Sequence, residues 1–235
     1  MGYWTWYLLS FGLAYATRYP GLAALAVVFW LARGILPDPV LVLRTFRRIS
    51  KLKSDIALNP ANMVATRDLA RVYVDIKRSK KAIVLLEQTR ERMAASTRHP
   101  QGSRDDAELL YLLGLSRLRA GDPTKAIDAL VAAVAIAPDL AYGEPYLVAS
   151  EALVRLGRWE EAEDSLERFL DVNKSSVRGW VRLARVRAKR DDGAGAQEAI
   201  REAKHTWAGL PSFKRRHEWG PYASAIVSPL WLGLL

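Results

Sequence analysis

Side chains that could catalyse a reaction are few in this chain of 235 residues, and their spacing does not suit catalysis. No two of the three histidines, His99, His205 and His217, stand at the spacing that places two metal ligands on one helix face. The sequence has no cysteine, no phosphate-binding glycine loop and no nucleophile elbow. It therefore predicts no metal site, no cofactor, no small-molecule substrate and no enzymatic activity.

The charged residues also argue against chemistry and against nucleic-acid binding. The carboxylate pairs Glu160-Glu161 and Asp191-Asp192 stand where helices are expected to begin, where they complement the positive end of a helix dipole. The formal net charge is +10, but the basic residues form two clusters and otherwise lie among acidic neighbours. No nucleic-acid partner is therefore expected.

Small and large apolar residues recur with a period of about 34 residues, and this period defines the elements of the chain. The pattern is clearest over 107–140, where it consists of Leu110, Leu113, Gly114, Ala126, Leu130, Ala133 and Pro138. It resembles the tetratricopeptide repeat (TPR), a helix-turn-helix unit of that length. Two antiparallel helices approach closely only where both present small side chains, which is the expected role of Gly114 and Ala126.

Three further copies fit the same frame and begin near Met63, Gly143 and Val177. The resemblance therefore implies an all-α fold, a TPR-type helix-turn-helix solenoid of about four repeats over residues 61–210. Tight turns between paired helices are expected at Gly121-Asp122 and at Gly157-Arg158.

Two departures from the pattern stand out. Arg117 occupies a position that is usually aromatic. A polar stretch at 97–106 widens the spacing between the first two copies, and we expect it to form a loop.

The first 36 residues are predicted to be a hydrophobic membrane anchor, because apolar content rises far above that of a soluble domain only there. The segment favours either one transmembrane helix centred on 22–36 or a helical hairpin that turns at Arg18-Pro20, and both stay open. Two alternatives are a signal peptide cleaved near Ala14-Tyr15-Ala16 and a helix pair buried in a soluble fold or against a membrane-protein partner.

Residues 37–60 are predicted to form a basic juxtamembrane linker or helix. Its basic residues are Arg44, Arg47, Arg48, Lys51 and Lys53. Such clusters stay on the cytoplasmic side of a membrane and attract anionic lipid head groups. We therefore expect the protein at a membrane, with membrane lipids among its partners and the repeats on the cytoplasmic side.

Residues 211–235 are predicted to be a basic-aromatic and apolar tail, after a capping helix that ends at about Lys204 to Trp207. The residues expected at the membrane interface are Lys214, Arg215, Arg216 and Trp219. The uncharged end of this segment is short and contains Pro229, so we expect it to dip into the membrane surface or to pack on the N-terminal helices.

In the TPR family, the first helix of each repeat (helix A) lines a concave groove. The shared frame nominates as groove residues Arg67, Arg71, Tyr111, Arg119, Glu151, Arg155, Arg178, Arg185 and Lys189. The resemblance thus implies a protein or peptide partner, and the basic ends of the groove favour a segment whose acidic residues flank an apolar stretch.

Together these observations predict a membrane-anchored TPR adaptor or scaffold that holds a protein or peptide partner near the cytoplasmic face. The alternative is a structural or assembly subunit of a membrane complex, including an assembly factor that faces the periplasm.

Overall fold

The computed structural model describes residues 18, 19, 21, 39–60, 62–94 and 102–227. The chain divides into two units, Met1–Ser54 and Asp55–Leu235. Apart from Arg18, Tyr19 and Gly21, the predicted anchor lies outside the described residues. Among the helices that are described, none combines the length and the apolar character that a membrane crossing requires.

Helix α3 (Pro39–Leu58) carries the first basic cluster. It begins at a proline, whose fixed φ angle suits the first turn of a helix. All five predicted basic residues of this cluster are exposed, and so are the apolar side chains of Leu43 and Phe46.

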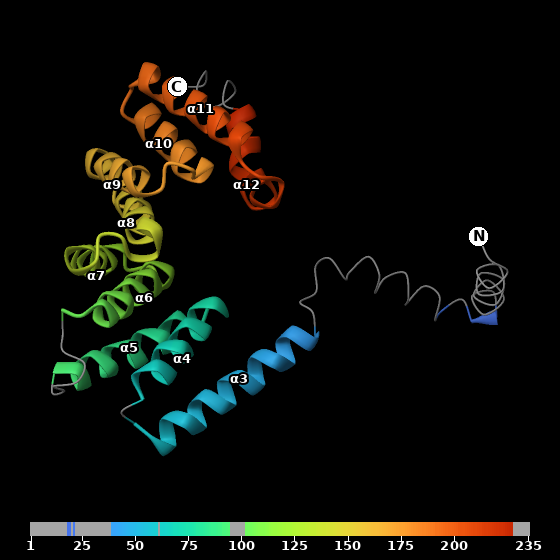
Figure 1. Cartoon of the computed structure of the whole chain (residues 1–235), viewed down its shortest axis with the longest axis vertical. Coiled ribbons are helices and arrows are strands. Elements are labelled where there is room, and N and C mark those ends of the chain that lie inside the picture. Colours follow the sequence, from blue (N-terminus) through green and yellow to red (C-terminus); the bar gives the residue numbers. More distant parts are fainter. Residues whose placement is uncertain (1–17, 20, 22–38, 61, 95–101, 228–235) are drawn as a thin grey trace. The chain divides into compact units, whose positions relative to one another are not determined.

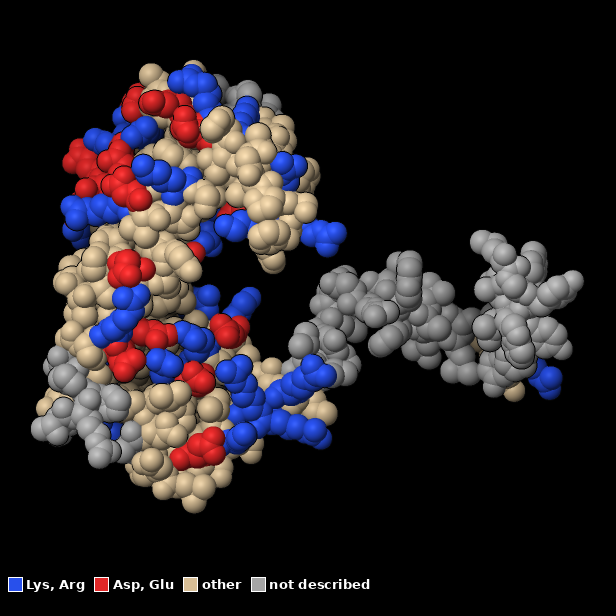
Figure 2. Space-filling model, viewed as in Figure 1, with Lys and Arg blue, Asp and Glu red and all other residues tan. Residues whose placement is uncertain are grey.

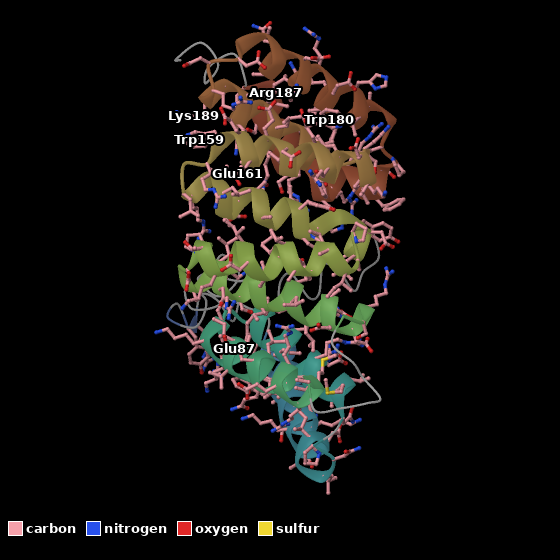
Figure 3. The ribbon with its side chains drawn as sticks, turned by 90° about the vertical axis from the view of Figure 1, so that its left-hand side faces the viewer. Glu87, Trp159, Glu161, Trp180, Arg187 and Lys189 are labelled. Carbon is pink, nitrogen blue, oxygen red and sulfur yellow. The ribbon has the colours of Figure 1, made fainter. Side chains whose placement is uncertain are left out.

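The second unit contains helical hairpins that stack in sequence order (Figures 1 and 3). The four hairpins are formed by α4 (Met63–Asp75) and α5 (Ser79–Ala94), α6 (Arg104–Ala120) and α7 (Pro123–Ile136), α8 (Glu144–Arg155) and α9 (Trp159–Val172), and α10 (Val177–Lys189) and α11 (Gly193–Gly209). A short 3-10 helix, η1 (Leu140–Gly143), precedes α8, and α12 (Ser212–Ile226) follows α11. The predicted all-helical solenoid and its four copies are confirmed.

Small residues inside the second hairpin allow its two helices to approach, as predicted. A Cβ atom added to Gly114 of α6 would lie 2.6 Å from Cγ of Leu130 and 3.1 Å from the carbonyl oxygen of Ala126, both in α7. The turn that follows also matches its prediction. Gly121 has a φ angle of 91°, in the left-handed region that favours glycine, and the side chain of Asp122 accepts a hydrogen bond from the Lys125 amide.

The loop predicted for 97–106 was wrong at its end, because α6 already begins at Arg104. The helix starts there because an ion pair, which the polar sequence did not reveal, buries the side chain of Asp106. Asp106 is 1% exposed, and it accepts hydrogen bonds from Nε of Arg90 at 2.7 Å and from the amide of Gly102 at 3.0 Å. Ser103 caps the first turn by accepting a hydrogen bond from the Asp106 amide. Residues 95–101 lie outside the description.

The capping helix also differs from its prediction. Residues 204–207 belong to α11, the second helix of the fourth repeat, and the cap is α12, within the segment predicted as a tail. Tyr222 of α12 stacks on Trp207 of α11, with ring centroids 4.2 Å apart. Glu218 accepts a hydrogen bond from the backbone amide of Arg178 at 3.0 Å, which satisfies a free donor at the start of α10. Lys214, Arg215, Arg216 and Trp219, which were predicted at the membrane interface, are all exposed on α12.

Candidate binding site

Several of the predicted groove residues bond to an adjacent repeat. Arg67 of α4 donates to Glu108 of α6 with 3.0 Å between Nη1 and Oε2, and Arg71 pairs with the same carboxylate. Arg178 of α10 pairs in the same way with Glu144 of α8. These arginines therefore fasten adjacent A helices together, and a role in binding a partner stays a prediction for them.

Tyr111, another of the predicted groove residues, is half-buried on α6. Burial raises the pKa of its hydroxyl, and the negative charge of Glu144 adds to this effect, while Arg119 and Arg178 oppose it. The phenol is therefore neutral near physiological pH. A neutral phenol can stack and can donate and accept hydrogen bonds.

The residue at position 13, the last predicted groove position of a repeat, connects two repeats at the first and second junctions. Repeat positions are counted here from Met63, Ala107, Gly143 and Val177. At position 13, Arg119 donates from Nη1 to the carbonyl oxygen of Val74 at 2.7 Å, and Arg155 donates to that of Leu118 at 3.0 Å. Both acceptors stand at position 12 of the preceding repeat. Each arginine thus closes the gap between two A helices at their C-terminal ends.

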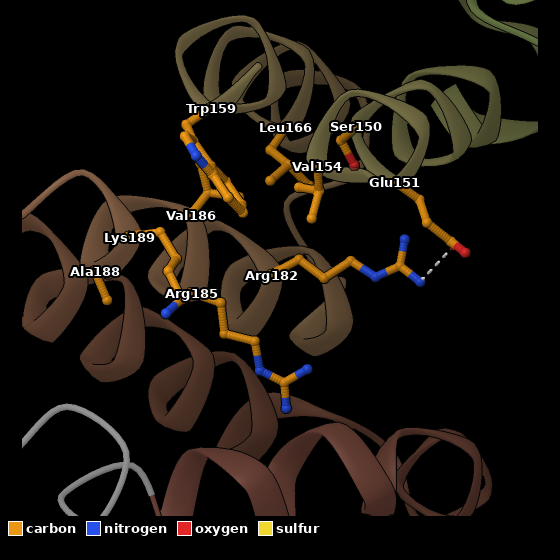
Figure 4. Close-up of a pocket in the computed structure, with 10 residues that line it drawn as sticks. All are labelled: Ser150, Glu151, Val154, Trp159, Leu166, Arg182, Arg185, Val186, Ala188 and Lys189. Carbon is orange, nitrogen blue, oxygen red and sulfur yellow. Dashed lines mark hydrogen bonds and ion pairs between the residues drawn. The ribbon is translucent and has the colours of Figure 1, made fainter. Parts of the chain in front are cut away.

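The third junction is different, because Lys189 stands at position 13. Lysine lacks the planar fork of donors with which arginine spans this gap. Instead, Lys189 and its neighbours line a cavity of about 730 Å³ between α8, α9 and α10 (Figure 4). The residues that line it are Ser150, Glu151, Val154, Trp159, Leu166, Arg182, Arg185, Val186, Ala188 and Lys189.

Two further substitutions set this junction apart. Arg182 stands at position 6, where the second and third repeats have the buried residues Leu112 and Val148. Trp159 stands at position 17, at the first residue of α9, and its ring lies over the cavity (Figure 4). The cavity therefore coincides with residues at positions 6, 13 and 17 that differ from those at the other two junctions.

The guanidinium of Arg182 is held away from the cavity interior by two partners. It donates to the carbonyl oxygen of Leu147 at 3.2 Å and to Glu151 at 3.3 Å. Burial lowers the pKa of Arg182, and the nearby carboxylate of Glu151 works in the opposite direction. Glu151 also accepts a hydrogen bond from Arg155 at 2.8 Å. Among the lining residues that the structure describes, Glu151 is the one carboxylate, and it already pairs with two arginines.

Arg185 lies at the edge of the cavity nearest to α12. Its Nη2 donates to the hydroxyl of Ser224 on α12 at 2.5 Å. Lys189 is exposed, and within the described part of the chain its ammonium group contacts no carboxylate. Of the predicted groove residues, Glu151, Arg185 and Lys189 thus come together at one site.

Arg117 stands at position 11, which is usually aromatic, and the structure shows what it does on the outer edge of the stack. Arg117 donates to Glu87 of α5 at 2.8 Å, and Arg187, at the same position of the fourth repeat, donates to Glu167 of α9 at 2.8 Å. Arg187 also bonds to Glu163 through Nε at 2.8 Å. Figure 3 shows Glu87 and Arg187 on the same side of the stack. Each arginine thus bonds to the second helix of the preceding repeat, and we call this contact the position-11 clasp.

The charged side chains that are described alternate in sign over the visible face of the repeats (Figure 2). In the same residues, no group of three or more His, Cys, Asp and Glu side chains could hold a metal ion.

Sequence reasoning missed Arg182, Trp159 and the cavity itself. A signal was present, because aligning the four copies against each other shows an arginine at a position that holds Leu112 and Val148 in its neighbours. Whether that arginine points inward or outward depends on packing between repeats, which no single repeat encodes.

A family model described as tetratricopeptide repeat matches residues 67–141 and 147–211, and a second model with the same description matches residues 117–175. The two ranges matched by the first model together cover more than half of the chain. The chain belongs to the tetratricopeptide repeat family. This confirms the resemblance read from Gly114, Ala126 and their counterparts.

Solved structures share the TPR fold of this chain. A crystal structure of MamA has a TM-score of 0.58 at 20% identity, with 67% of this chain and 85% of that chain covered. A MamA fragment from Desulfovibrio magneticus has a TM-score of 0.60 at 15% identity, covering 73% and 94%. YrrB, described as a TPR protein with an unusual peptide-binding site, has a TM-score of 0.55 at 18% identity, covering 72% and 81%. No curated protein matches the sequence.

Proposed function

We propose that this TPR protein is a membrane-anchored adaptor that binds a protein or peptide partner on its A helices, on the cytoplasmic side, without catalysing a reaction. TPR arrays in general mediate protein–protein interactions and scaffolding, because their stacked helices present an extended surface. The proposal adds a place on that surface, a membrane and a side of the membrane.

The cavity between α8 and α10 is the observation that carries the binding role. Its volume of about 730 Å³ lies within the range of pockets that proteins use for ligands, and its wall is formed largely by apolar side chains such as Val154, Leu166 and Val186. A TPR whose only task was rigidity would gain stability by filling this space, as the leucine and valine at position 6 do elsewhere.

The sequence supports the membrane part of the proposal. Residues 1–36 are rich in apolar and aromatic residues, and the basic cluster that follows lies exposed on α3. A basic cluster next to an anchor favours the cytoplasmic side and contact with anionic lipids.

A structural or assembly subunit of a membrane complex is the second candidate. It is favoured by the ion pairs of Arg67, Arg71 and Arg178, which use predicted groove residues to fasten the repeats together. In that case the cavity would take no exchangeable partner.

Membrane attachment is tested by fractionating cells that express the full chain with a C-terminal epitope tag. We expect the chain in the membrane pellet after carbonate extraction, and we expect protease to cut the repeats in inside-out vesicles but not in right-side-out ones. A chain in the supernatant would remove the anchor, and the reverse protease pattern would place the repeats on the other side.

Partner binding is tested by photo-crosslinking in the same membranes. A photo-reactive amino acid at Val154, in the cavity wall, is compared with one at Val131, an exposed residue of α7. An adaptor gives a defined crosslinked species from Val154 only, and that species disappears when Lys189→Glu is added while membrane attachment is kept. A crosslink that persists in Lys189→Glu favours the structural subunit.

A further inference from the structure

Two polar side chains in the wall of the cavity at the third junction, Ser150 and Arg182, already have hydrogen-bond partners. The hydroxyl of Ser150 already donates to the carbonyl oxygen of Leu147 at 2.8 Å. Arg182 donates to the same carbonyl oxygen and to Glu151. The group that enters the cavity is therefore apolar, since an entering polar group would lose its hydration without gaining a partner.

The mouth of the cavity carries the opposite character. Among the described lining residues, two exposed basic side chains, Arg185 and Lys189, lie there with one acidic side chain, Glu151. Glu151 is occupied by Arg155 and Arg182, so it cannot neutralise Lys189. An anionic group is therefore the complement of the mouth.

The acidic residues just outside the mouth do not change this balance. Glu161 is held by Arg158, with 2.5 Å between Nη2 and Oε2, and the Arg158 guanidinium lowers the pKa of that carboxyl. Glu160 lies 3.6 Å from Arg190. Both carboxylates thus have partners of their own, and Lys189 stays without one in the described structure.

We propose that the cavity between α8 and α10 binds the bulky apolar side chain of a peptide segment, and that Lys189 binds an aspartate or glutamate beside that side chain. This deepens the adaptor role and rests on it, because it names the chemistry that the adaptor recognises. An aromatic or leucine side chain of the peptide fills the apolar cavity beneath Trp159, and the peptide's carboxylate stays at the exposed mouth.

The test selects peptides from a random phage-displayed library on the full chain held in lipid nanodiscs. The selected peptides are then tested for binding to Val154→Trp, which fills the cavity, and to Val131→Trp, which serves as a control for adding a surface tryptophan. We expect peptides that combine an aromatic residue or leucine with a neighbouring Asp or Glu, and that bind the wild type and Val131→Trp but not Val154→Trp.

Charge reversal at an exposed residue provides a second measurement that does not depend on the fold of the filled variant. Fluorescence polarisation of a selected peptide should show about tenfold weaker binding to Lys189→Glu and unchanged binding to Lys204→Glu, an exposed control on α11. Replacing the peptide's acidic residue by lysine should reverse this preference.

The remaining outcomes overturn the inference in distinguishable ways. Peptides that bind Val154→Trp and Lys189→Glu as well as the wild type would place the binding surface elsewhere and leave the adaptor role intact. Peptides that bind only when Trp231→Ala alters the C-terminal segment would assign the cavity to the chain's own tail. A selection without any specific peptide would remove both the inference and the peptide-binding role.

Discussion

The junction between the first and second repeats and the junction between the third and fourth use the same clasp but differ on the A-helix side. Arg117 and Arg187 bond to a glutamate at the same position of the preceding repeat. On the A-helix side, the first of these junctions has a buried leucine at position 6 and an arginine at position 13, whereas the other has Arg182 and Lys189. The comparison teaches that ion pairs on the outer edge can hold two hairpins together, while different residues at positions 6 and 13 of the A helices can leave room for a binding site.

The largest effect is expected from Leu112→Arg, which gives the first junction the position-6 arginine of the third. Leu112 is 3% exposed, and position 9 of the preceding repeat is Arg71, not a carboxylate like Glu151. A buried arginine beside another arginine should lower the free energy of unfolding by about 3 kcal/mol or more. Urea denaturation followed by circular dichroism measures it.

The matched control is Arg182→Leu, the reverse exchange. It removes a buried charge and fills the space with an apolar side chain, so stability should stay the same or rise by about 1 kcal/mol. If Arg182→Leu destabilised the chain as much as Leu112→Arg, the two junctions would not differ in the way described.

An intermediate effect is expected from removing the clasps. Arg187 bonds to two glutamates, and its side chain is 18% exposed, so Arg187→Ala should cost about 2 kcal/mol of unfolding free energy after allowance for solvent screening. Arg117→Ala removes one pair whose glutamate is 44% exposed and should cost about 1 kcal/mol. Equal losses in denaturant titrations would contradict this ranking.

The smallest effects are expected from exchanging the residues at position 13. Arg155→Lys removes the bond to the Leu118 carbonyl oxygen and should cost about 0.5–1 kcal/mol. Lys189→Arg restores the arginine at the third junction and should narrow the cavity, leaving stability within about 0.5 kcal/mol of the wild type. Peptide affinity provides the discriminating readout, since only Lys189→Arg should weaken it.

The hairpins could be predicted from the sequence because their determinants are local. Gly114, Gly121 and Pro123 each fix a close approach, a turn or a helix start within a few residues. The start of α6 escaped prediction because Asp106 is buried through a bond to Arg90, sixteen residues earlier in the chain. Such a pair leaves no periodic signal.

The predicted groove residues lie on the A helices, and their role in binding stays a prediction, but the sequence did not show which of them contact the adjacent repeat. Arg119 and Arg155 reach the backbone of the preceding repeat, a contact that spans 45 and 37 residues of sequence. A single repeat therefore shows where a side chain begins and not which neighbour it reaches. The cavity arises from the joint effect of positions 6, 13 and 17, which only a comparison among the copies brings together.

The position-11 clasp has a consequence for the middle of the array. In the third repeat this position holds Leu153, which is 5% exposed, and within the described residues no ion pair joins the second repeat to the third. Salt weakens the attraction between exposed charges by screening, but it leaves apolar contacts intact or strengthens them. High ionic strength should therefore weaken the first and third junctions more than the second.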